Sequence, residues 1–504
     1  MNKQIKFGII LQYLQMGLNI LISLIYTPIM IKILGQSEYG IYNLSSSIIS
    51  YLSLLSLGFG ASYIRYYSKY KKDNDEEGVK KLNALYLLVF AIMGAIAFIA
   101  GVILSSNVHI FFNETYSLND LHIAKVLMMF LAINLTISFP ASVFVSYITS
   151  QEKFIFQKIV NMGKTILSPA LSIALLYMGY GSIGMVLVTT VVSLIIDILN
   201  IYYCVSKLNM RFKFKNLNFM LLKDIAAFSI FIAINQVIDQ INWQTDKIIL
   251  GKMINGGAVA IYAVASTINT MYINFSTAIS SVFAPKINRI VATNSDDSEK
   301  KLNDIFFFVG RLQFMVIMLI LTGFIIFGKK FISMWVGSEY KMAYFVTLLL
   351  IIPVSIPLIQ NVGVEIQRAK NKHQFRSVAY LIMAILNIFI SVLLCKFYGI
   401  IGVSLGTTIS LLLSNGFVMN VYYHKKLNID IFGFWKEIMK TSRGLIIPAV
   451  FGLLLYNLQY KNVLTYFLCI GVYSLVYIVS ILVFSTTSYE KKAIKGMLVR
   501  NSKC

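Results

Sequence analysis

Long apolar segments recur along the whole chain, with short polar segments between them. Fourteen of these segments are long enough to cross the roughly 30 Å hydrocarbon core of a bilayer as helices. They lie near residues 7–33, 41–64, 82–105, 122–149, 159–179, 182–204, 224–250, 258–284, 306–328, 343–367, 377–396, 400–423, 443–458 and 463–484. The pattern predicts an all-α, polytopic membrane protein with about 14 transmembrane helices.

The seventh apolar segment contains an unusual number of polar side chains. On a helix, positions i, i+4, i+7 and i+11 share one face that extends for about 16 Å. A charged group costs a few kcal/mol at the centre of a bilayer, so this face is expected to line a cavity. The face consists of Asn235, Asp239, Asn242 and Asp246, and Gln236, Gln240, Trp243 and Lys247 form an adjoining stripe.

Milder polar faces occur in the first, second and eighth segments, with Asn274 in the eighth. We interpret these segments and the seventh as the walls of a shared central cleft, with close packing of small residues as the alternative interpretation. Trp243 also has two interpretations: stacking on a sugar ring, or a place in the aromatic belt of the membrane interface.

Three further charged residues are candidates for a transport role. In the tenth segment Asn361, Glu365 and Arg368 follow helical spacing. Glu365 is a candidate for a carboxylate that titrates during transport, or it pairs with Arg368. Arg65, at the end of the second segment, is either a positive-inside anchor or a contact for a phosphate group.

The chain contains an internal repeat. "YGSIGMVLVTT" begins at Tyr180 and "YGIIGVSLGTT" at Tyr398, while "ILG" before Gln36 matches "ILG" before Lys252. "IYNLSSSI" from Ile41 likewise matches "IYAVASTI" from Ile261. The period is six segments, an even number, so both copies insert with the same orientation. The repeat predicts two parallel six-helix lobes, residues 1–208 and 209–430, followed by two further helices and a tail over residues 431–504.

The net charge of +23 is distributed unevenly. If the N-terminus is cytoplasmic, most of the 44 Lys and Arg fall in cytoplasmic segments, which is the positive-inside bias of membrane proteins. The bias predicts that both termini are cytoplasmic, and it argues against nucleic-acid binding. The basic loops favour anionic lipid headgroups. The Lys/Asn/Ile-rich, Pro-poor composition indicates an AT-rich bacterial genome, and the expected location is the cytoplasmic membrane of a bacterium.

The short loops limit the classes of function. Because no loop is large enough for a folded domain, a membrane enzyme is not favoured. The four cysteines and four histidines are scattered without metal-ligand spacing, and no cofactor or metal site is predicted. A chain that is nearly all membrane helix with short loops indicates transport.

Three short motifs connect the chain to a known family. "LGQSEYGIY" (Leu34–Tyr42), "LGFGASYIRYY" (Leu57–Tyr67) and "DKIILG" (Asp246–Gly251) resemble the polysaccharide-transporter branch of the multidrug/oligosaccharidyl-lipid/polysaccharide exporter superfamily. The resemblance implies a two-lobed, V-shaped transporter that flips polyprenyl-diphosphate-linked oligosaccharide units by alternating access. The chain differs from relatives that flip the peptidoglycan precursor. Those relatives carry clustered arginines in the N-terminal lobe, where this chain has Arg65 and Lys32.

The sequence therefore predicts a flippase for surface polysaccharide assembly. Its expected partners are the polyprenyl-diphosphate-linked glycan, membrane lipid, H⁺ or Na⁺ as coupling ion, and the glycan polymerase machinery. The alternatives are a cation-coupled multidrug antiporter and a non-transporting scaffold of a glycan assembly complex. Asp239, Asp246 and Glu365 are the candidates for ion coupling. The candidates for substrate binding are Arg65, Asn235, Asp239, Asn242, Trp243, Asp246, Lys247, Asn274, Asn361 and Arg368.

Overall fold

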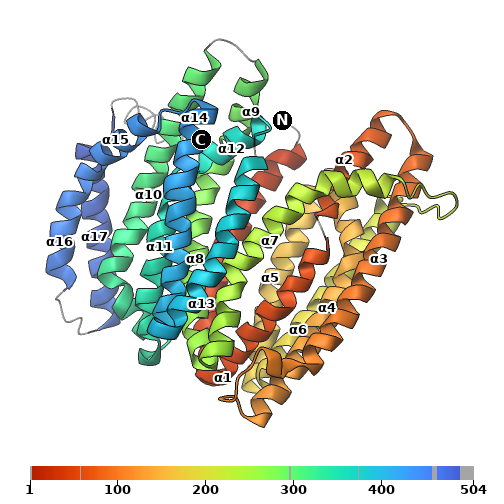
Figure 1. Cartoon of the computed structure of the whole chain (residues 1–504), viewed down its shortest axis with the longest axis horizontal. Coiled ribbons are helices and arrows are strands. Elements are labelled where there is room, and N and C mark those ends of the chain that lie inside the picture. The colour runs from red at the N-terminus through yellow and green to blue at the C-terminus, as the bar shows by residue number, and fades with distance from the viewer. Residues whose placement is uncertain (1–2, 57, 294–296, 373, 457–461, 488–504) are drawn as a thin grey trace. The chain divides into compact units, whose positions relative to one another are not determined.

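A computed structural model describes residues 3–56, 58–293, 297–372, 374–456 and 462–487. The predicted cytoplasmic tail at 489–504 and Cys504 lie outside the described residues. Within the described ranges the chain is helical and contains no strand (Figure 1). The chain divides into two compact units, Met1–Thr267 with Ser377–Thr407 (unit 1) and Ile268–Arg376 with Thr408–Cys504 (unit 2). The two predicted lobes, residues 1–208 and 209–430, are not the same division as these units and stay a prediction.

Long helices form both units. Unit 1 contains α1 (Lys3–Ser50), α2 (Phe59–Lys72), α3 (Glu76–Ser106), α4 (Leu118–Ser150), α5 (Phe154–Tyr177), α6 (Gly181–Tyr202), α7 (Leu221–Met253), the first part of α8 (Gly256–Ser281) and most of α13 (Gln374–Leu411). Unit 2 contains the rest of α8 and α13, with α9 (Ala284–Thr293), α10 (Ser298–Trp335), α11 (Met342–Ile359), α12 (Asn361–Ala369), α14 (Met419–Leu427), α15 (Ile431–Ser442), α16 (Ile446–Tyr456) and α17 (Val463–Phe484).

The helices agree with the predicted membrane segments. Among the described residues, eleven stretches are long and apolar enough to cross a membrane, or twelve if the two parts of α7, bent by 44°, form one span. Two of these stretches each correspond to two of the fourteen predicted segments: Leu11–Lys72 holds most of the first and all of the second, and Gln374–Leu427 holds the eleventh and twelfth. The prediction of a polytopic, all-helical membrane protein is confirmed.

Two glycines divide these double stretches. Inside α1, Gly35 has φ 73° and ψ 174°, and inside α13, Gly399 has φ 56° and ψ −130°. Residues with a Cβ rarely adopt these positive φ values, so glycine lets the chain turn sharply between one span and the next. Gly181, the partner of Gly399 in the repeat, also has a positive φ of 55°.

Two predicted segments are interrupted. The second, 41–64, contains a 3₁₀ helix at Tyr51–Ser56 between α1 and α2. The tenth, 343–367, is broken at Gln360 into α11 and α12, after two prolines in α11. Proline lacks the backbone N–H that a continuous helix needs, which accounts for the break near this point.

Unit 1 has an aromatic core between α2, α3 and α4. Tyr63 packs edge-on against Tyr86, with ring centroids 5.0 Å apart, and its hydroxyl donates to Asn83 Oδ1 at 2.6 Å. Tyr67 packs edge-on against Tyr147 at 5.6 Å. Buried tyrosine hydroxyls need hydrogen-bond partners, and these helices provide them.

Unit 2 has a core of its own around α10. Phe306 packs against Phe434 of α15, with ring centroids 4.8 Å apart. The buried Arg311 guanidinium donates to Glu437 at 3.0 Å and to the backbone oxygen of Ser485 at 2.7 Å. A buried cation of this kind must be paired, so Arg311 ties α10 to α15 and to the end of α17.

Candidate functional site: a buried carboxylate and a polar seam in unit 1

Asp246 lies at the centre of a buried polar cluster in unit 1. Its side chain is 1% exposed. One carboxylate oxygen, Oδ2, accepts hydrogen bonds from the Tyr262 hydroxyl and from Thr407 Oγ1, the latter at 2.6 Å. The other oxygen, Oδ1, is buried and makes no hydrogen bond to the described protein atoms. Because a buried carboxylate oxygen without a donor is costly, the arrangement suits a bound proton or cation.

Oxygen atoms from α13 extend this cluster. Ser391 Oγ donates to Asn387 Oδ1 at 3.0 Å and lies 3.3 Å from the backbone oxygen of Val403. Thr407 Oγ1 lies 3.4 Å from Asn387 Nδ2. The positive φ of Gly399 lets the two arms of α13 fold against each other, and Gly406 leaves room for Ser391. A set of neutral oxygens around one carboxylate is the ligand type that H⁺- and Na⁺-coupled membrane proteins use.

A second polar feature, which we call the α1–α7 seam, runs beside the cluster. Ser47 donates to Gln244 Oε1 at 2.9 Å, and Gln240 Nε2 bonds Ser53 Oγ at 3.2 Å. Ser50 donates to Gln240 Oε1 at 3.1 Å. Gln240 and Gln244 are one helical turn apart on α7, so they present their amides to the same side. The seam gives these amides hydrogen-bond partners that lipid would not provide.

The predicted polar face of α7 does not form one continuous site. Asp246 is buried, whereas Asn235 and Asp239 are exposed. Asn235 Nδ2 donates to Ser377 Oγ at 3.1 Å. The remaining predicted residues of this helix, Asn242, Trp243 and Lys247, are half-buried. The ammonium of Lys247 lies 3.4 Å from Gln244 Oε1, at the seam.

Arg65 lies apart from this cluster. Its side chain is exposed on α2, and the guanidinium carbon is 4.5 Å from the centre of the Phe228 ring. A cation over an aromatic face is stabilised by the ring quadrupole. The Arg65 guanidinium therefore stacks on the Phe228 ring, and this contact leaves its N–H groups available to bind other groups.

Four predicted residues belong to α12 and to the part of α8 in unit 2. Glu365 Oε1 accepts from Arg368 at 2.9 Å, in the i,i+3 pair that the sequence allowed as one interpretation. Asn361 Nδ2 donates to Ser280 Oγ at 2.7 Å. Asn274 is half-buried. The substrate-binding role of Asn274, Asn361 and Arg368 stays a prediction, as does the coupling role of Glu365.

The sequence reasoning missed both hydrogen-bond partners of Asp246 and the polar residues of α13 that extend the cluster. Tyr262, Asn387, Ser391 and Thr407 were not candidates, although Asn387 and Ser391 have i,i+4 spacing in an apolar segment. A polar pair at that spacing is the same signal that singled out α7. Glu38 was also missed: it accepts from the backbone and hydroxyl of Ser182 at 2.7 and 2.6 Å.

Comparisons with known proteins place the chain in a family. The sequence model described as "Polysaccharide biosynthesis protein" matches residues 6–291, more than half of the chain. A comparison with curated proteins gives no match.

Solved structures share the fold. The structure described as "Lipid II flippase MurJ, inward closed conformation" is similar with a TM-score of 0.75 and 16% identity, over 97% of this chain and 99% of that chain. An inward-facing multidrug resistance MATE family transporter of the MOP superfamily gives 0.66 and 14% identity, over 82% of this chain and 96% of that chain. A MOP superfamily transporter from Pyrococcus furiosus gives 0.55 and 16% identity, over 83% and 96%.

The resemblance seen in the sequence motifs is thus confirmed. The match covers α1 to α9, which include the α1–α7 seam and Asp246. The chain belongs to the polysaccharide biosynthesis protein family and has the polytopic helical fold of the MOP superfamily.

Proposed function

We propose that the protein is a flippase that moves polyprenyl-diphosphate-linked oligosaccharide units from the inner to the outer leaflet for surface polysaccharide assembly. Membership of the polysaccharide biosynthesis family is the observation that carries this proposal. The likeness in fold to a lipid II flippase over nearly the whole chain supports it.

The polar side chains of the membrane helices suit this substrate. Sugar hydroxyls and a diphosphate cannot enter hydrocarbon without losing their hydrogen bonds to water. Amides and hydroxyls such as those of the α1–α7 seam replace those bonds. Arg65 and Arg368 are proposed as contacts for the diphosphate, since guanidinium groups bind phosphate oxygens well. Trp243 is proposed to stack on a sugar ring.

Ion coupling is proposed to depend on Asp246. Its second carboxylate oxygen has no donor among the described residues. The hydroxyl and amide groups of its cluster are neutral, and the neighbouring Lys247 ammonium is a charged group that acts on it. Binding of H⁺ or Na⁺ there would neutralise the buried charge, and release would restore it. Glu365 is a weaker candidate because Arg368 already neutralises it. Asp239, which is exposed on α7, is the third candidate.

The remaining expectations are part of the same proposal. The protein would lie in the cytoplasmic membrane of a bacterium with both termini cytoplasmic. Residues 1–208 and 209–430 would act as lobes that alternate access, and residues 431–504 would be accessory. Membrane lipid and a glycan polymerase would be its partners.

The proposal is tested with a deletion strain. Lipids are extracted and analysed by mass spectrometry for polyprenyl-linked oligosaccharide, and surface polysaccharide is measured in parallel. Completed lipid-linked units should accumulate while surface polysaccharide is lost, and the wild-type gene should reverse both changes. Intact export without accumulation would contradict the proposal. Increased drug susceptibility of such a strain would then indicate a MATE-like antiporter.

A further inference from the structure

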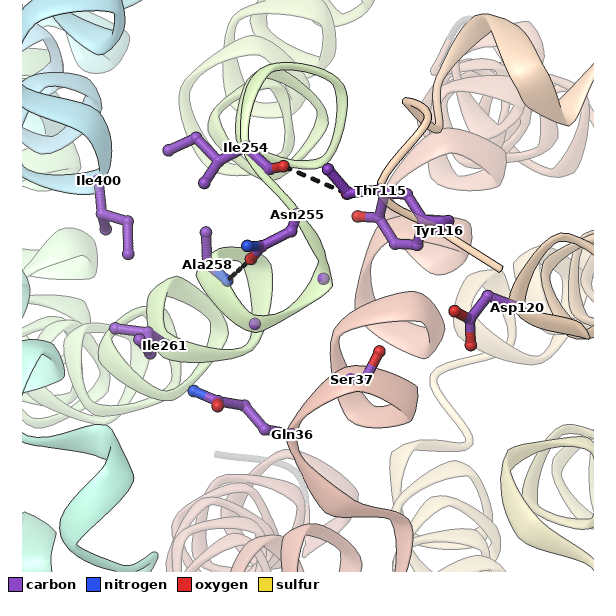
Figure 2. A pocket seen from close by; sticks show the side chains of 12 residues that line it. Gln36, Ser37, Thr115, Tyr116, Asp120, Ile254, Asn255, Ala258, Ile261 and Ile400 are labelled. Carbon is purple, nitrogen blue, oxygen red and sulfur yellow. Dashed lines mark hydrogen bonds between the residues drawn. The ribbon is translucent and has the colours of Figure 1, made fainter. Parts of the chain in front are cut away.

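A hollow of about 540 Å³ lies in unit 1, and neither Asp246 nor the residues of the α1–α7 seam line it. Its walls come from four stretches of chain: the turn after Gly35 in α1, the segment before and at the start of α4, the junction of α7 and α8, and the bend of α13. Figure 2 shows the side chains of Gln36, Tyr116 and Asn255 coming from different ribbons around one space. With the predicted orientation, this end of unit 1 faces outward.

Glycines at the start of α8 keep this space open. A Cβ on Gly257 would lie 3.3 Å from Asn255 Oδ1 and 3.6 Å from the side-chain amide carbon of Gln36. A Cβ on Gly256 would lie 3.3 Å from the Tyr116 ring. Neither glycine has a positive φ. The missing side chains therefore let Ser37, Gln36, Asn255 and Tyr116 approach the start of α8 at the wall of the hollow, and they do not serve an unusual backbone.

The polar atoms of the hollow are incompletely paired. Tyr116 is 8% exposed, and its buried hydroxyl makes no hydrogen bond to the described protein atoms. Burial raises the pKa of this hydroxyl, so it stays protonated and can donate. Asn255 Oδ1 accepts a hydrogen bond from the Ala258 backbone N–H at 2.9 Å. This bond does not use the side-chain NH₂ group of Asn255, which is a donor. A buried hydroxyl without a partner is expected where a ligand completes the site.

The mixture of groups indicates the class of ligand. None of the twelve described residues that line the hollow is a lysine or arginine, which disfavours a phosphate. One carboxylate is present, Asp120, and its Oδ2 already accepts from the Ser117 backbone N–H at 3.0 Å, which disfavours a metal ion. Amides and hydroxyls such as Gln36 and Ser37, beside isoleucine side chains, match the hydroxyls and apolar faces of a neutral sugar.

We infer that this hollow binds the saccharide portion of the transported lipid-linked oligosaccharide, at the outward end of unit 1. The inference rests on the proposed function, and it assigns the site a neutral carbohydrate, with the diphosphate held elsewhere. Tyr116 and Asn255 donate to sugar oxygens, Asp120 accepts from a sugar hydroxyl, and Gly257 provides space for the ring.

The test measures sugar binding and export separately. The probe is an oligosaccharide fragment made by partial hydrolysis of the producing strain's own surface polysaccharide. Its binding to the full-length protein in nanodiscs is followed by saturation-transfer NMR. Tyr116→Phe removes one hydroxyl, and Gly257→Leu fills the hollow without a backbone penalty. Tyr398→Phe is the matched control, because Tyr398 is 62% exposed and does not line the hollow.

We expect Tyr116→Phe to weaken binding about fivefold, the effect of one lost hydrogen bond. Gly257→Leu should abolish binding, and Tyr398→Phe should change nothing. Unchanged binding in both pocket variants would overturn the inference, and the proposed function would stand if export still fails in the deletion strain. If Gly257→Leu does not fold, Tyr116→Phe and Gln36→Ala decide the result.

Discussion

When the two copies of the repeat are aligned on their shared Ile-Leu-Gly sequence, one buried position differs in kind. The first copy has Met30, 7% exposed, where the second has Asp246, 1% exposed. The two other matching motifs of the repeat, each aligned on its own residues, pair Tyr42 with Tyr262 and Thr189 with Thr407. The hydroxyl-bearing partners thus occur in both copies, and the carboxylate occurs in one.

The threonines show the consequence of this difference. Thr189 Oγ1 bonds the backbone oxygen of Met185 in its own helix at 2.8 Å, whereas Thr407 Oγ1 bonds Asp246 at 2.6 Å. The fold of the repeat is therefore compatible with an apolar residue at this position. The proposed coupling role would account for a costly buried carboxylate at this position of one copy, and the predictions below test that explanation.

The largest effect is expected from placing the carboxylate in the first copy. Met30→Asp should destabilise the protein by about 3 kcal/mol, since an aspartate in a membrane helix costs that much on insertion scales. Thermal unfolding of the purified protein in detergent measures the change, with Met30→Leu as the control. A Met30→Asp protein as stable as wild type would show that the first copy can also hold a carboxylate.

Asp246→Asn tests the function of the carboxylate in the second copy. An amide oxygen can still accept from Tyr262 and Thr407, so the fold should persist, while H⁺ or Na⁺ can no longer be bound and released. We expect export to fall about tenfold or more. Surface polysaccharide in the complemented deletion strain is measured over a range of pH and Na⁺ concentration. Normal export by the variant under every condition would exclude Asp246 as the coupling residue.

A smaller effect is expected at the two threonines. Thr407→Val should cost about 1 kcal/mol, because it removes a donor from the buried carboxylate. The variant should also change how export depends on ion concentration. Thr189→Val, the matched change in the first copy, should cost about 0.5 kcal/mol or less. Equal losses in thermal stability for the two variants would contradict the difference between the copies.

The smallest effect on the protein is expected from two single-cysteine variants. They test the orientation in the membrane that both copies of the repeat are predicted to share. Leu118→Cys, at an exposed site of 88%, should react with a membrane-impermeant maleimide in intact cells. Lys72→Cys, at the exposed end of α2, should react only after the membrane is permeabilised. Both are made in a protein whose four natural cysteines are alanine. The reverse labelling pattern would invert the orientation and would place the saccharide hollow inside the cell.

Much of the fold could be predicted because a bilayer imposes strong rules on sequence. Segment length and hydropathy located the spans. The sharp turns at Gly35 and Gly399, which separate consecutive spans, were not predicted and became visible only in the backbone angles. The break at Gln360 was foreshadowed by two prolines, but its position depends on packing within unit 2.

The site was harder to predict because its members are distant in the sequence. Helical spacing grouped Asp246 with Asn235 and Asp239, yet only Asp246 is buried. Helical periodicity identifies a face but not the neighbour that covers it. Thr407, 161 residues away, becomes a partner only through the packing of α13. The saccharide hollow depends in the same way on four separate segments.

The division of unit 1 into two stretches of chain has a consequence for biosynthesis. Tyr262 follows Asp246 after 16 residues, whereas Thr407 follows after 161. At about 5–20 residues per second, the ribosome reaches Thr407 roughly 8–32 s after Asp246. During that interval the aspartate has emerged with one of its two hydroxyl partners, and the residues of unit 2 between Ile268 and Arg376 are made before unit 1 is complete. Asp246 therefore enters the membrane well before Thr407, and the second of its two hydroxyl donors arrives only with the last span of unit 1.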